Sequence, residues 1–352
     1  MGSLCLSDSI YRKGTVGCLS QLAPPKTFCY NAATSFQRIQ TLAAAIKAPK
    51  FKLAFLGPKF WPVWLGVFVL YTITWLPLPV IRAIGGGTGK LIALIVPKRA
   101  KVAKRNLTLW NPTLSASEVE ALYKENVRRT GMALFETAMG WWWPSWRVKR
   151  AIEIEGTEHV EAALANGKGV FGMALHNMNL EFACRGIGFF RPSIAFYRKH
   201  NNPLVDYLQY HGRNRSNKYM IDKRNAKALL AALDDKELCL YLPDQDYGPK
   251  QSIFVPFGGV KDTATTTATL MFIRRSHSEP MIITSQYTKR GYKIKIYPPL
   301  SQLGDMEDAE ALTLLNQHVD AAVKEQPESY LWMHKRFKTR PEGNPESLYK
   351  SL

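Results

Sequence analysis

The chain has 352 residues, 46% of them hydrophobic and 21% charged, a balance that excludes an intrinsically disordered protein and allows one large core with an accessory segment. Lys and Arg outnumber Asp and Glu by 47 to 28, but residues 1–117 hold 15 of the basic residues and a single acid, Asp8. Basic charge gathered around an apolar segment favours anionic lipid headgroups over nucleic acid as a partner. The sequence has no zinc-ligand spacing, RNP-like pattern or helix-turn-helix signature.

The N-terminal region divides into a leader and an apolar segment. Residues 1–50 are nearly free of acid and lack an apolar run long enough for a signal peptide, so they are a disordered extension, a transit segment or the product of a misassigned start. Residues 60–81 then carry no charge over 22 positions, which is long enough to cross the hydrocarbon core of a bilayer. Because Pro62, Pro77 and Pro79 shorten the ideal helix to about 15 residues, a deeply embedded or tilted helix is one alternative. A buried core helix of a soluble domain is the other, but the basic residues on both sides favour membrane attachment.

Basic residues flank this apolar segment on both sides and are more numerous after it. The positive-inside tendency therefore places the main domain in the cytoplasm. We predict a membrane anchor over residues 51–106 and an α/β domain over residues 107–352, with a short interfacial apolar piece at 91–96. Ser115 and Glu118 have the spacing of a helix start that leads into residues 119–139.

The rest of the chain alternates between strand and helix patterns, which predicts one mixed-sheet α/β domain flanked by helices. The predicted strands are residues 170–175, 193–197, 238–241, 253–257, 281–287 and 294–297. The predicted helices are residues 180–188, 203–213, 226–236, 264–275 and 309–325.

The five cysteines do not indicate a disulfide framework, because their number is odd and no two have CxxC spacing. A reducing environment fits this usage best. Cys184 follows Glu181 by three positions but has no base partner of its own, so we interpret it as a small buried residue. The cysteines are Cys5, Cys18, Cys29, Cys184 and Cys239.

His176 stands at the end of the buried strand predicted at 170–175, and Glu181 opens the helix predicted after it. On one continuous helix, positions five apart lie about 140° around the axis and do not meet. A His176–Glu181 pair therefore requires the histidine to lie in the turn. The carboxylate would then hold one ring nitrogen while the other takes a proton from a hydroxyl. The alternative is a partly buried histidine beside an unrelated surface glutamate.

Charged residues gather after three further predicted elements. Arg213 and Arg215 are candidate phosphate ligands, although each is equally explained as a surface arginine. Arg198 lies in the charged cluster that precedes them and is a candidate substrate contact. Asp244 and Asp246 follow an apolar strand directly, at the place where α/β proteins bind ligands, or else they belong to an ordinary turn. The tail at 332–343 is basic and includes Phe337. It could bind an acidic lipid or an acidic partner, or its charged side chains could simply be solvated.

Other chemistries have weaker support. The sequence contains no GxSxG elbow, P-loop, HExxH motif or GxGxxG after a strand. The GGGTGK run at 85–90 lacks the P-loop spacing. We therefore expect neither a metal nor a cofactor.

Together these residues resemble the lysophospholipid acyltransferase superfamily, and within it the bacterial lipid A late acyltransferases. The superfamily motif is His, four residues, then Asp or Glu, matched by His176 and Glu181. The segments 203–218, 243–249 and 336–343 resemble the lipid A branch more specifically. The resemblance runs from about Pro58 to Tyr349 and leaves the first fifty residues without a counterpart. It implies a glycerolphosphate-acyltransferase-like fold, with residues 107–352 as the acyltransferase domain.

The resemblance also implies roles for individual residues. His176 would be the general base on the acceptor's 3-hydroxyacyl hydroxyl, with Glu181 orienting its imidazole. Arg213 would bind a substrate phosphate or the oxyanion, and Asp244 would hold that arginine or a polar headgroup. Arg198, Arg215 and Asp246 are further expected substrate contacts, and neither a cofactor nor a metal is implied.

The implied reaction is acyl transfer from an acyl carrier protein thioester to Kdo2-lipid IVA at the cytoplasmic face of the bacterial inner membrane. Residues 136–144 resemble the lauroyl-transferring members. Palmitoleoyl or myristoyl transfer, another glycolipid or lysophospholipid acceptor, and a non-catalytic lipid-binding scaffold remain the alternatives.

Overall fold

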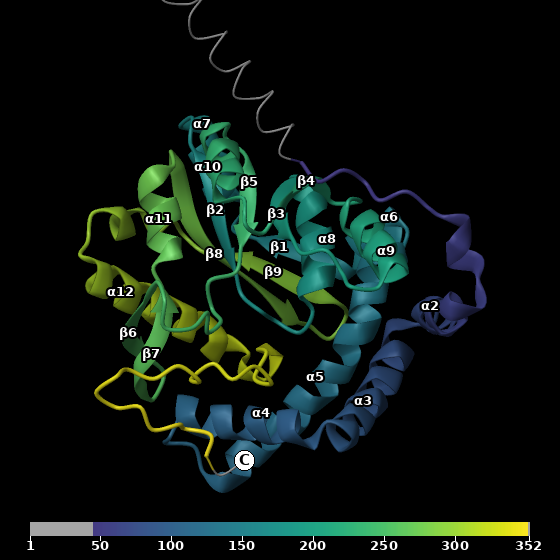
Figure 1. Cartoon of the computed structure of the whole chain (residues 1–352), viewed down its shortest axis with the longest axis horizontal. Helices are drawn as coiled ribbons and strands as arrows, with labels where there is room; N and C mark the ends of the chain where they lie inside the picture. Colours follow the sequence, from purple (N-terminus) through teal and green to yellow (C-terminus); the bar gives the residue numbers. More distant parts are fainter. Residues whose placement is uncertain (1–44, 351–352) are drawn as a thin grey trace, which may run out of the picture.

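The computed structural model describes residues 45–350, so the predicted leader lies almost entirely outside the described residues, as do Cys5, Cys18 and Cys29. A central sheet flanked by helices forms the body of the molecule (Figure 1). The strands are β1 (Ile152–Glu155), β2 (Gly169–Ala174), β3 (Ser193–Tyr197), β4 (Asn217–Asp222), β5 (Leu238–Tyr241), β6 (Ser252–Phe257), β7 (Val260–Thr266), β8 (Ser278–Tyr287) and β9 (Tyr292–Ile296). The α-helices are α2 (Trp61–Thr74), α3 (Leu78–Ile95), α4 (Pro97–Trp110), α5 (Ala116–Trp142), α6 (Ser145–Ala151), α7 (Thr157–Ala165), α8 (Leu180–Phe190), α9 (Pro203–Arg213), α10 (Ala226–Asp234), α11 (Ala268–Arg275) and α12 (Asp308–Glu325).

The main sheet has seven strands in the order β1-β9-β8-β2-β5-β3-β4. Its centre is parallel, because β2 pairs in parallel with both β5 and β8. The β8–β9 pair is antiparallel, which makes the sheet mixed. The predicted mixed α/β architecture is therefore confirmed.

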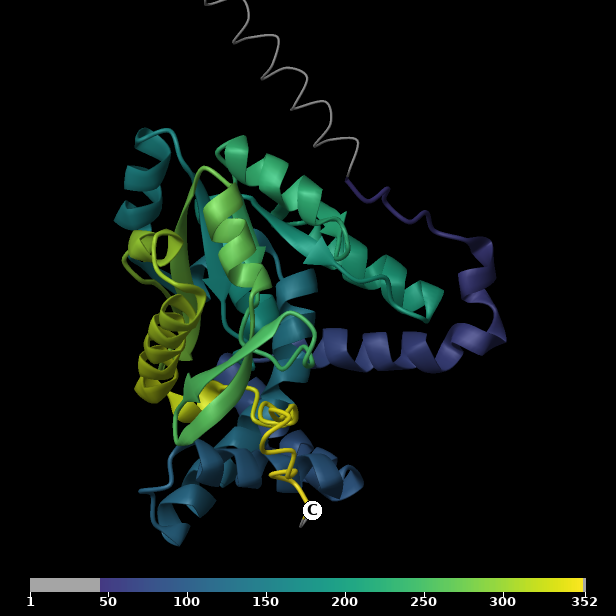
Figure 2. The same ribbon diagram turned by 60° about the vertical axis from the view of Figure 1, so that its left-hand side comes forward.

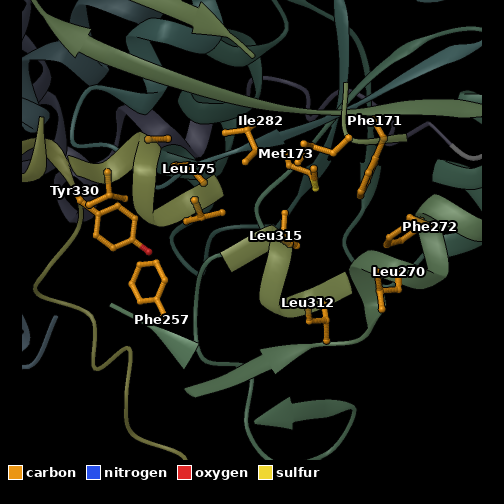
Figure 3. Packing of buried hydrophobic residues seen from close by; sticks show 14 of the residues in the cluster. Phe171, Met173, Leu175, Phe257, Leu270, Phe272, Ile282, Leu312, Leu315 and Tyr330 are labelled. Carbon is orange, nitrogen blue, oxygen red and sulfur yellow. The ribbon is translucent and has the colours of Figure 1, made fainter. Parts of the chain in front are cut away.

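Side chains of β2 alternate between the two faces of the sheet, and both faces are covered. Phe171 and Met173 point into a large core with α10, α11 and α12, while Val170 packs on the other face with α7 and α8. Figure 3 shows Phe171, Met173 and Leu175 beside side chains of α11 and α12. A strand buried on both faces is what the unbroken apolar run at 170–175 predicts.

Strands β6 and β7 form a separate two-stranded antiparallel sheet. The predicted helix at 264–275 was therefore wrong at its start, because residues 264–266 belong to β7 and α11 begins only at Ala268. The threonines at 263–266 are β-branched, which favours a strand over a helix. The sequence pattern predicted no strand at β1, β4 or β7.

The apolar segment at 60–81 is not one helix, which corrects the predicted span. It forms α2 and the beginning of α3, separated at Trp75–Pro77, because Pro77 precedes α3 and Pro79 occupies its first turn. Leu65 and Phe68 of α2 are exposed, and α2 lies at the edge of the molecule in Figures 1 and 2. Within residues 45–350, α3 is the helix with the length and composition of a membrane span, and 22% of it is buried.

Glycines bring α3 against α5 at backbone contact. A Cβ atom on Gly89 would lie 2.1 Å from the Val127 carbonyl oxygen, and one on Gly131 would lie 2.1 Å from the Gly85 carbonyl oxygen. Only residues without a side chain fit at so close a crossing.

Helix α5 begins with the predicted capping box, in which Ser115 and Glu118 bond to each other's backbone N–H. The predicted interfacial piece at 91–96 is the exposed end of α3 and not a separate element.

Candidate active site

His176 follows β2 by two residues and is held by Asp244, which follows β5 by three. The His176 Nδ1 atom lies 2.6 Å from Asp244 Oδ1, and the His176 backbone N–H donates to Asp244 Oδ2 at 2.9 Å. Because β2 and β5 are neighbouring parallel strands, their carboxyl ends meet at one edge of the sheet. Strand order therefore brings this histidine and this aspartate together across 68 positions of sequence.

Asp244 is buried, and burial alone would raise the pKa of its carboxyl group. The charge of the His176 imidazolium and the hydrogen bonds from the His176 ring and backbone outweigh this effect, so the pKa of Asp244 is lowered. Asp244 is thus an anion that fixes the proton of the imidazole on Nδ1.

The other ring nitrogen of His176, Nε2, has no hydrogen-bond partner within residues 45–350, and the side chain is 21% exposed. With Nδ1 protonated, Nε2 carries the free lone pair. An imidazole in this state accepts a proton from a hydroxyl that approaches from the open side, which is the geometry of a general base.

A C-terminal segment, residues 329–331, holds the backbone around His176, and no sequence pattern predicts this contact. The Leu331 N–H donates to the His176 carbonyl at 2.9 Å, and the Met178 N–H donates to the Ser329 carbonyl at 2.8 Å. The Tyr330 hydroxyl donates to the Asp244 carbonyl at 2.9 Å. The strand-end histidine and its aspartate are therefore both hydrogen-bonded to one further segment.

Glu181 does not contact the imidazole, which corrects the predicted His176–Glu181 hydrogen bond. It lies in the first turn of α8 and accepts hydrogen bonds from Arg213, including Nε at 3.1 Å, and from Trp141 Nε1 at 3.1 Å. The predicted contact between Asp244 and Arg213 is likewise wrong. Asp244 contacts the imidazole in place of Glu181, and Glu181 contacts Arg213 in place of Asp244.

The close packing of α8 on α5 explains the direction of Glu181. A Cβ atom on Gly140 of α5 would lie 3.0 Å from the Glu181 carbonyl oxygen, so the two helices cross closely at this point. Trp141 follows Gly140 on α5, and Arg213 is the last residue of α9. Glu181 therefore joins three helices, and its carboxylate is committed to Trp141 and Arg213.

A small, mostly apolar pocket of about 90 Å³ opens beside the Glu181–Arg213 pair. Its walls come from β2, β3, β4 and β5 and from α5, α8 and α9. The lining includes Trp141, Ala174, Phe196, Met220, Leu240 and Leu242. Ala174 precedes His176 by two residues, so the pocket and the imidazole belong to the same end of the sheet.

Residues 48–339 match the model of the bacterial lipid A biosynthesis acyltransferases, which covers most of the chain. The chain belongs to this family. It is 40% identical over 300 residues to the lipid A biosynthesis lauroyltransferase of Escherichia coli (strain K12), covering 84% of this chain and 98% of that protein. It is 38% identical over 304 residues to the palmitoleoyltransferase of the same strain, covering 85% and 98%. The myristoyltransferase of that strain is 26% identical over 306 residues, covering 84% and 92%.

The remaining predicted contacts of this lipid A acyltransferase lie in different places. Arg215 donates to the Trp141 carbonyl at 2.5 Å, close to the Glu181–Arg213 pair. Arg198 is exposed on the loop after β3. Asp246 accepts hydrogen bonds from the Thr339 backbone and hydroxyl at 2.7 and 2.8 Å. Asp246 therefore does not join Asp244 at the imidazole.

The described cysteines of this lipid A acyltransferase are free thiols. Burial, and then the charge of Glu181, raises the pKa of Cys184 to about 12, so its thiol is not a nucleophile at neutral pH. Among residues 45–350, no three His, Cys, Asp or Glu side chains are grouped to hold a metal ion.

Proposed function

We propose that this lipid A acyltransferase transfers laurate from an acyl carrier protein thioester to the 3-hydroxyacyl hydroxyl of Kdo2-lipid IVA. The observation that carries the proposal is the imidazole of His176, held at Nδ1 by a buried aspartate and open at Nε2. The 40% identity to a lauroyltransferase supports laurate. Palmitoleate is the second candidate, because the palmitoleoyltransferase is 38% identical over a similar share of the chain.

In the proposed reaction, His176 Nε2 takes the proton of the acceptor hydroxyl as the oxygen attacks the thioester carbonyl carbon. Asp244 stabilises the imidazolium that forms. The tetrahedral intermediate then collapses, the carbon–sulfur bond breaks, and the imidazolium returns its proton to the departing thiolate. No acyl-enzyme is required, because a thioester is already an activated donor and both substrates can be bound together.

Arg213 supplies positive charge at the edge of the pocket. Its Nε and Nη2 atoms are occupied by Glu181, which leaves Nη1 for the oxyanion or a substrate phosphate. In this account Glu181 acts through Arg213 and is a positioning residue. The apolar walls beside this pair suit the first part of the acyl chain, so the thioester carbonyl would lie between Arg213 and His176.

We propose that α2 and α3 hold the enzyme on the cytoplasmic face of the inner membrane. Half of the large apolar side chains of α2 are exposed, as are Leu91, Leu94 and Ile95 at the end of α3. An arrangement embedded in one leaflet is favoured over a span, because α3 packs along a charged part of α5. A Cβ atom on Gly86 would lie 2.8 Å from Arg128 Cγ, so a spanning α3 would carry Arg128 and its partner Glu125 into the hydrocarbon core.

The donor protein would be recruited by charge. The chain carries a formal net charge of +19, and an acidic carrier protein is attracted to such a surface before the two proteins dock. Association should therefore weaken as salt is raised.

The test is acyl transfer by the purified full-length protein in detergent, with lauroyl, palmitoleoyl and myristoyl carrier proteins as donors. Kdo2-lipid IVA, lysophosphatidate and a neutral glycolipid serve as acceptors. We expect a product whose mass gain corresponds to one lauroyl group on Kdo2-lipid IVA. Preferred transfer to another acceptor would replace the proposed substrate, and lipid binding without any transfer would indicate a scaffold.

A further inference from the structure

A cleft of about 470 Å³ lies between the start of α4 and the C-terminal segment, outside the site described above. Four cationic side chains line it, together with one carboxylate and one imidazole. These residues are Lys98, Arg99, Lys335, Lys338, Asp246 and His334. The proposed mechanism uses none of the four cations, although Lys335 and Lys338 belong to the basic tail at 332–343.

The positive charge of the cleft is not neutralised within the part of the chain that the structure describes. Lys98 and Lys338 are exposed and have no carboxylate within 4.0 Å. Arg99 donates to the Met333 carbonyl at 3.3 Å, and the Lys335 ammonium lies 5.2 Å from the centre of the Tyr349 ring. Like charges around one cleft repel each other, so an anion bound there would relieve this repulsion.

The single carboxylate of the cleft is already occupied by uncharged donors. Asp246 accepts from the Thr339 N–H and hydroxyl, and from the Gly248 N–H at 2.9 Å. It does not pair with a lysine. The cleft is therefore electropositive, and the carboxylate of Asp246 holds the backbone of its wall.

The start of α4 adds a second source of positive potential. The helix runs for 14 residues from Pro97, and Lys98 and Arg99 belong to its first turn. The amino end of a helix carries a partial positive charge and favours phosphate groups. Burial lowers the pKa of His334. Its Nε2 accepts the Asp246 N–H at 3.3 Å, so this atom is occupied by the wall of the cleft.

The cleft is joined to the candidate active site through two short segments. Asp246 stands two residues after Asp244, the partner of His176. On the other wall, the His334 N–H donates to the Leu331 carbonyl at 3.3 Å, and the Leu331 N–H donates to the His176 carbonyl at 2.9 Å. A group bound in the cleft is thus placed by the same backbone that places the imidazole.

The cleft also adjoins the exposed apolar end of α3. Leu94 and Ile95 are 78% and 69% exposed, and Lys98 follows Ile95 by three residues. A lipid whose chains lie beside Leu94 and Ile95 would present its headgroup at the level of Lys98 and Arg99. A hollow at this level fits a compact headgroup anion better than the broad surface of a carrier protein.

From these observations we propose that the cleft formed by Lys98, Arg99, Lys335 and Lys338 binds a phosphate of the lipid acceptor's headgroup. The bound phosphate would fix the acceptor so that its hydroxyl approaches His176 Nε2. The assignment of the bound lipid as the acceptor rests on the proposed function. The inference that the cleft binds an anion is independent of the proposed function.

The test is the double substitution K98Q/K338Q, which removes the two exposed cations. We expect the KM for Kdo2-lipid IVA in detergent micelles to rise about tenfold or more, with a smaller change in kcat and an unchanged KM for the lauroyl carrier protein. The matched control is K101Q/K261Q, which removes two exposed lysines of α4 and β7 outside the cleft. An equal rise in the control, or no rise in K98Q/K338Q, would overturn the proposal.

Equilibrium binding separates this proposal from the proposed function. Wild-type protein should bind micelles of Kdo2-lipid IVA more tightly than micelles of its dephosphorylated form, and K98Q/K338Q should lose that difference even if no turnover is found. Inorganic pyrophosphate should compete with the phosphorylated lipid for the wild type. If pyrophosphate binds while lipid affinity is unaffected by the substitution, the cleft is a free-anion site, and if only the donor KM rises, it is a carrier-protein site. Either outcome rejects the lipid assignment.

Discussion

His176 and Asp244 lie 68 positions apart in the chain, yet their side chains meet at 2.6 Å because the two strands that precede them are parallel neighbours. The aspartate is buried and the histidine is partly exposed, so only the histidine can reach a substrate. The pair therefore has the two parts of a general base, a buried anion that orients and an open nitrogen that accepts.

The first prediction concerns Asp244→Asn. This change keeps the shape of the side chain but removes the anion, so the imidazole loses the charge that fixes its tautomer and stabilises its protonated form. We expect kcat to fall by about 10²–10⁴-fold, with a small change in KM. Steady-state transfer from lauroyl carrier protein measures both constants.

Glu181→Gln is the matched comparison for this prediction. It removes the same charge from a carboxylate that contacts Arg213 and Trp141 instead of the imidazole. We expect a smaller loss of kcat than in Asp244→Asn. A larger loss would return the principal role to Glu181.

The second prediction concerns the crossing of α3 and α5. In Gly89→Ala the new methyl group would lie 2.1 Å from the Val127 carbonyl oxygen, and the helices would have to separate. We expect a loss of about 1–3 kcal/mol in the free energy of unfolding. Denaturant titration in detergent measures it.

Gly87→Ala provides the control for this crossing, since a methyl group there meets nothing within 4 Å. It should leave stability unchanged or raise it by about 0.5–1 kcal/mol, because alanine is the better helix former. Equal destabilisation by both substitutions would mean that α3 and α5 do not cross at these glycines.

The third prediction concerns Glu136, a buried carboxylate whose two oxygens accept the Tyr287 and Tyr292 hydroxyls at 2.8 Å. Burial raises its pKa to about 7, against the lowering effects of these tyrosines and of two nearby arginines. In the unfolded chain the pKa of this carboxyl group is near its ordinary value of 4.5. Between these values the folded state holds a proton that the unfolded chain has lost, so stability should fall as pH rises from 4.5 to 7, by roughly 3 kcal/mol.

Glu136→Gln removes this titration and should flatten that part of the stability curve. The measurement is the free energy of unfolding at pH 5, 6, 7 and 8 for both proteins. Parallel curves would exclude a raised pKa for Glu136.

The fourth prediction concerns membrane attachment. Leu94→Asp places a charge on an exposed apolar side chain at the end of α3, so it should weaken flotation with anionic vesicles while leaving the unfolding transition in place. Ala309→Asp adds the same charge at an exposed position of α12 and should float like the wild type. If Leu94→Asp floats like the wild type, the end of α3 does not contact the membrane.

Local patterns predicted much of this fold. The bounds of β3, β5 and α9 agree with those predicted. An apolar run and a helix that begins with proline are both patterns of consecutive residues, so they can be recognised without knowing the tertiary structure. Strand β4 was missed because its NKYMID sequence begins and ends with polar residues. The apolar pattern predicts one helix shortened by three prolines, whereas Pro77 and Pro79 stand where α2 ends and a second helix, α3, begins.

The site was predicted less completely for a physical reason. His176 and Asp244 were both recognised as strand-end residues, but parallel neighbours need not follow each other in sequence, and the chain does not record that β2 lies beside β5. The partner of Glu181 depends on how α5, α8 and α9 pack, which is equally non-local. Proximity in sequence therefore favoured Glu181 as the partner of His176, while strand order selected Asp244.

The most direct measurement of the central claim is the rate of acyl transfer by His176→Gln, in protein whose unfolding transition matches that of the wild type. Removing the base should lower kcat by about 10³-fold or more, whichever acyl group is transferred. A rate within tenfold of the wild type would contradict the assignment of His176 as the general base.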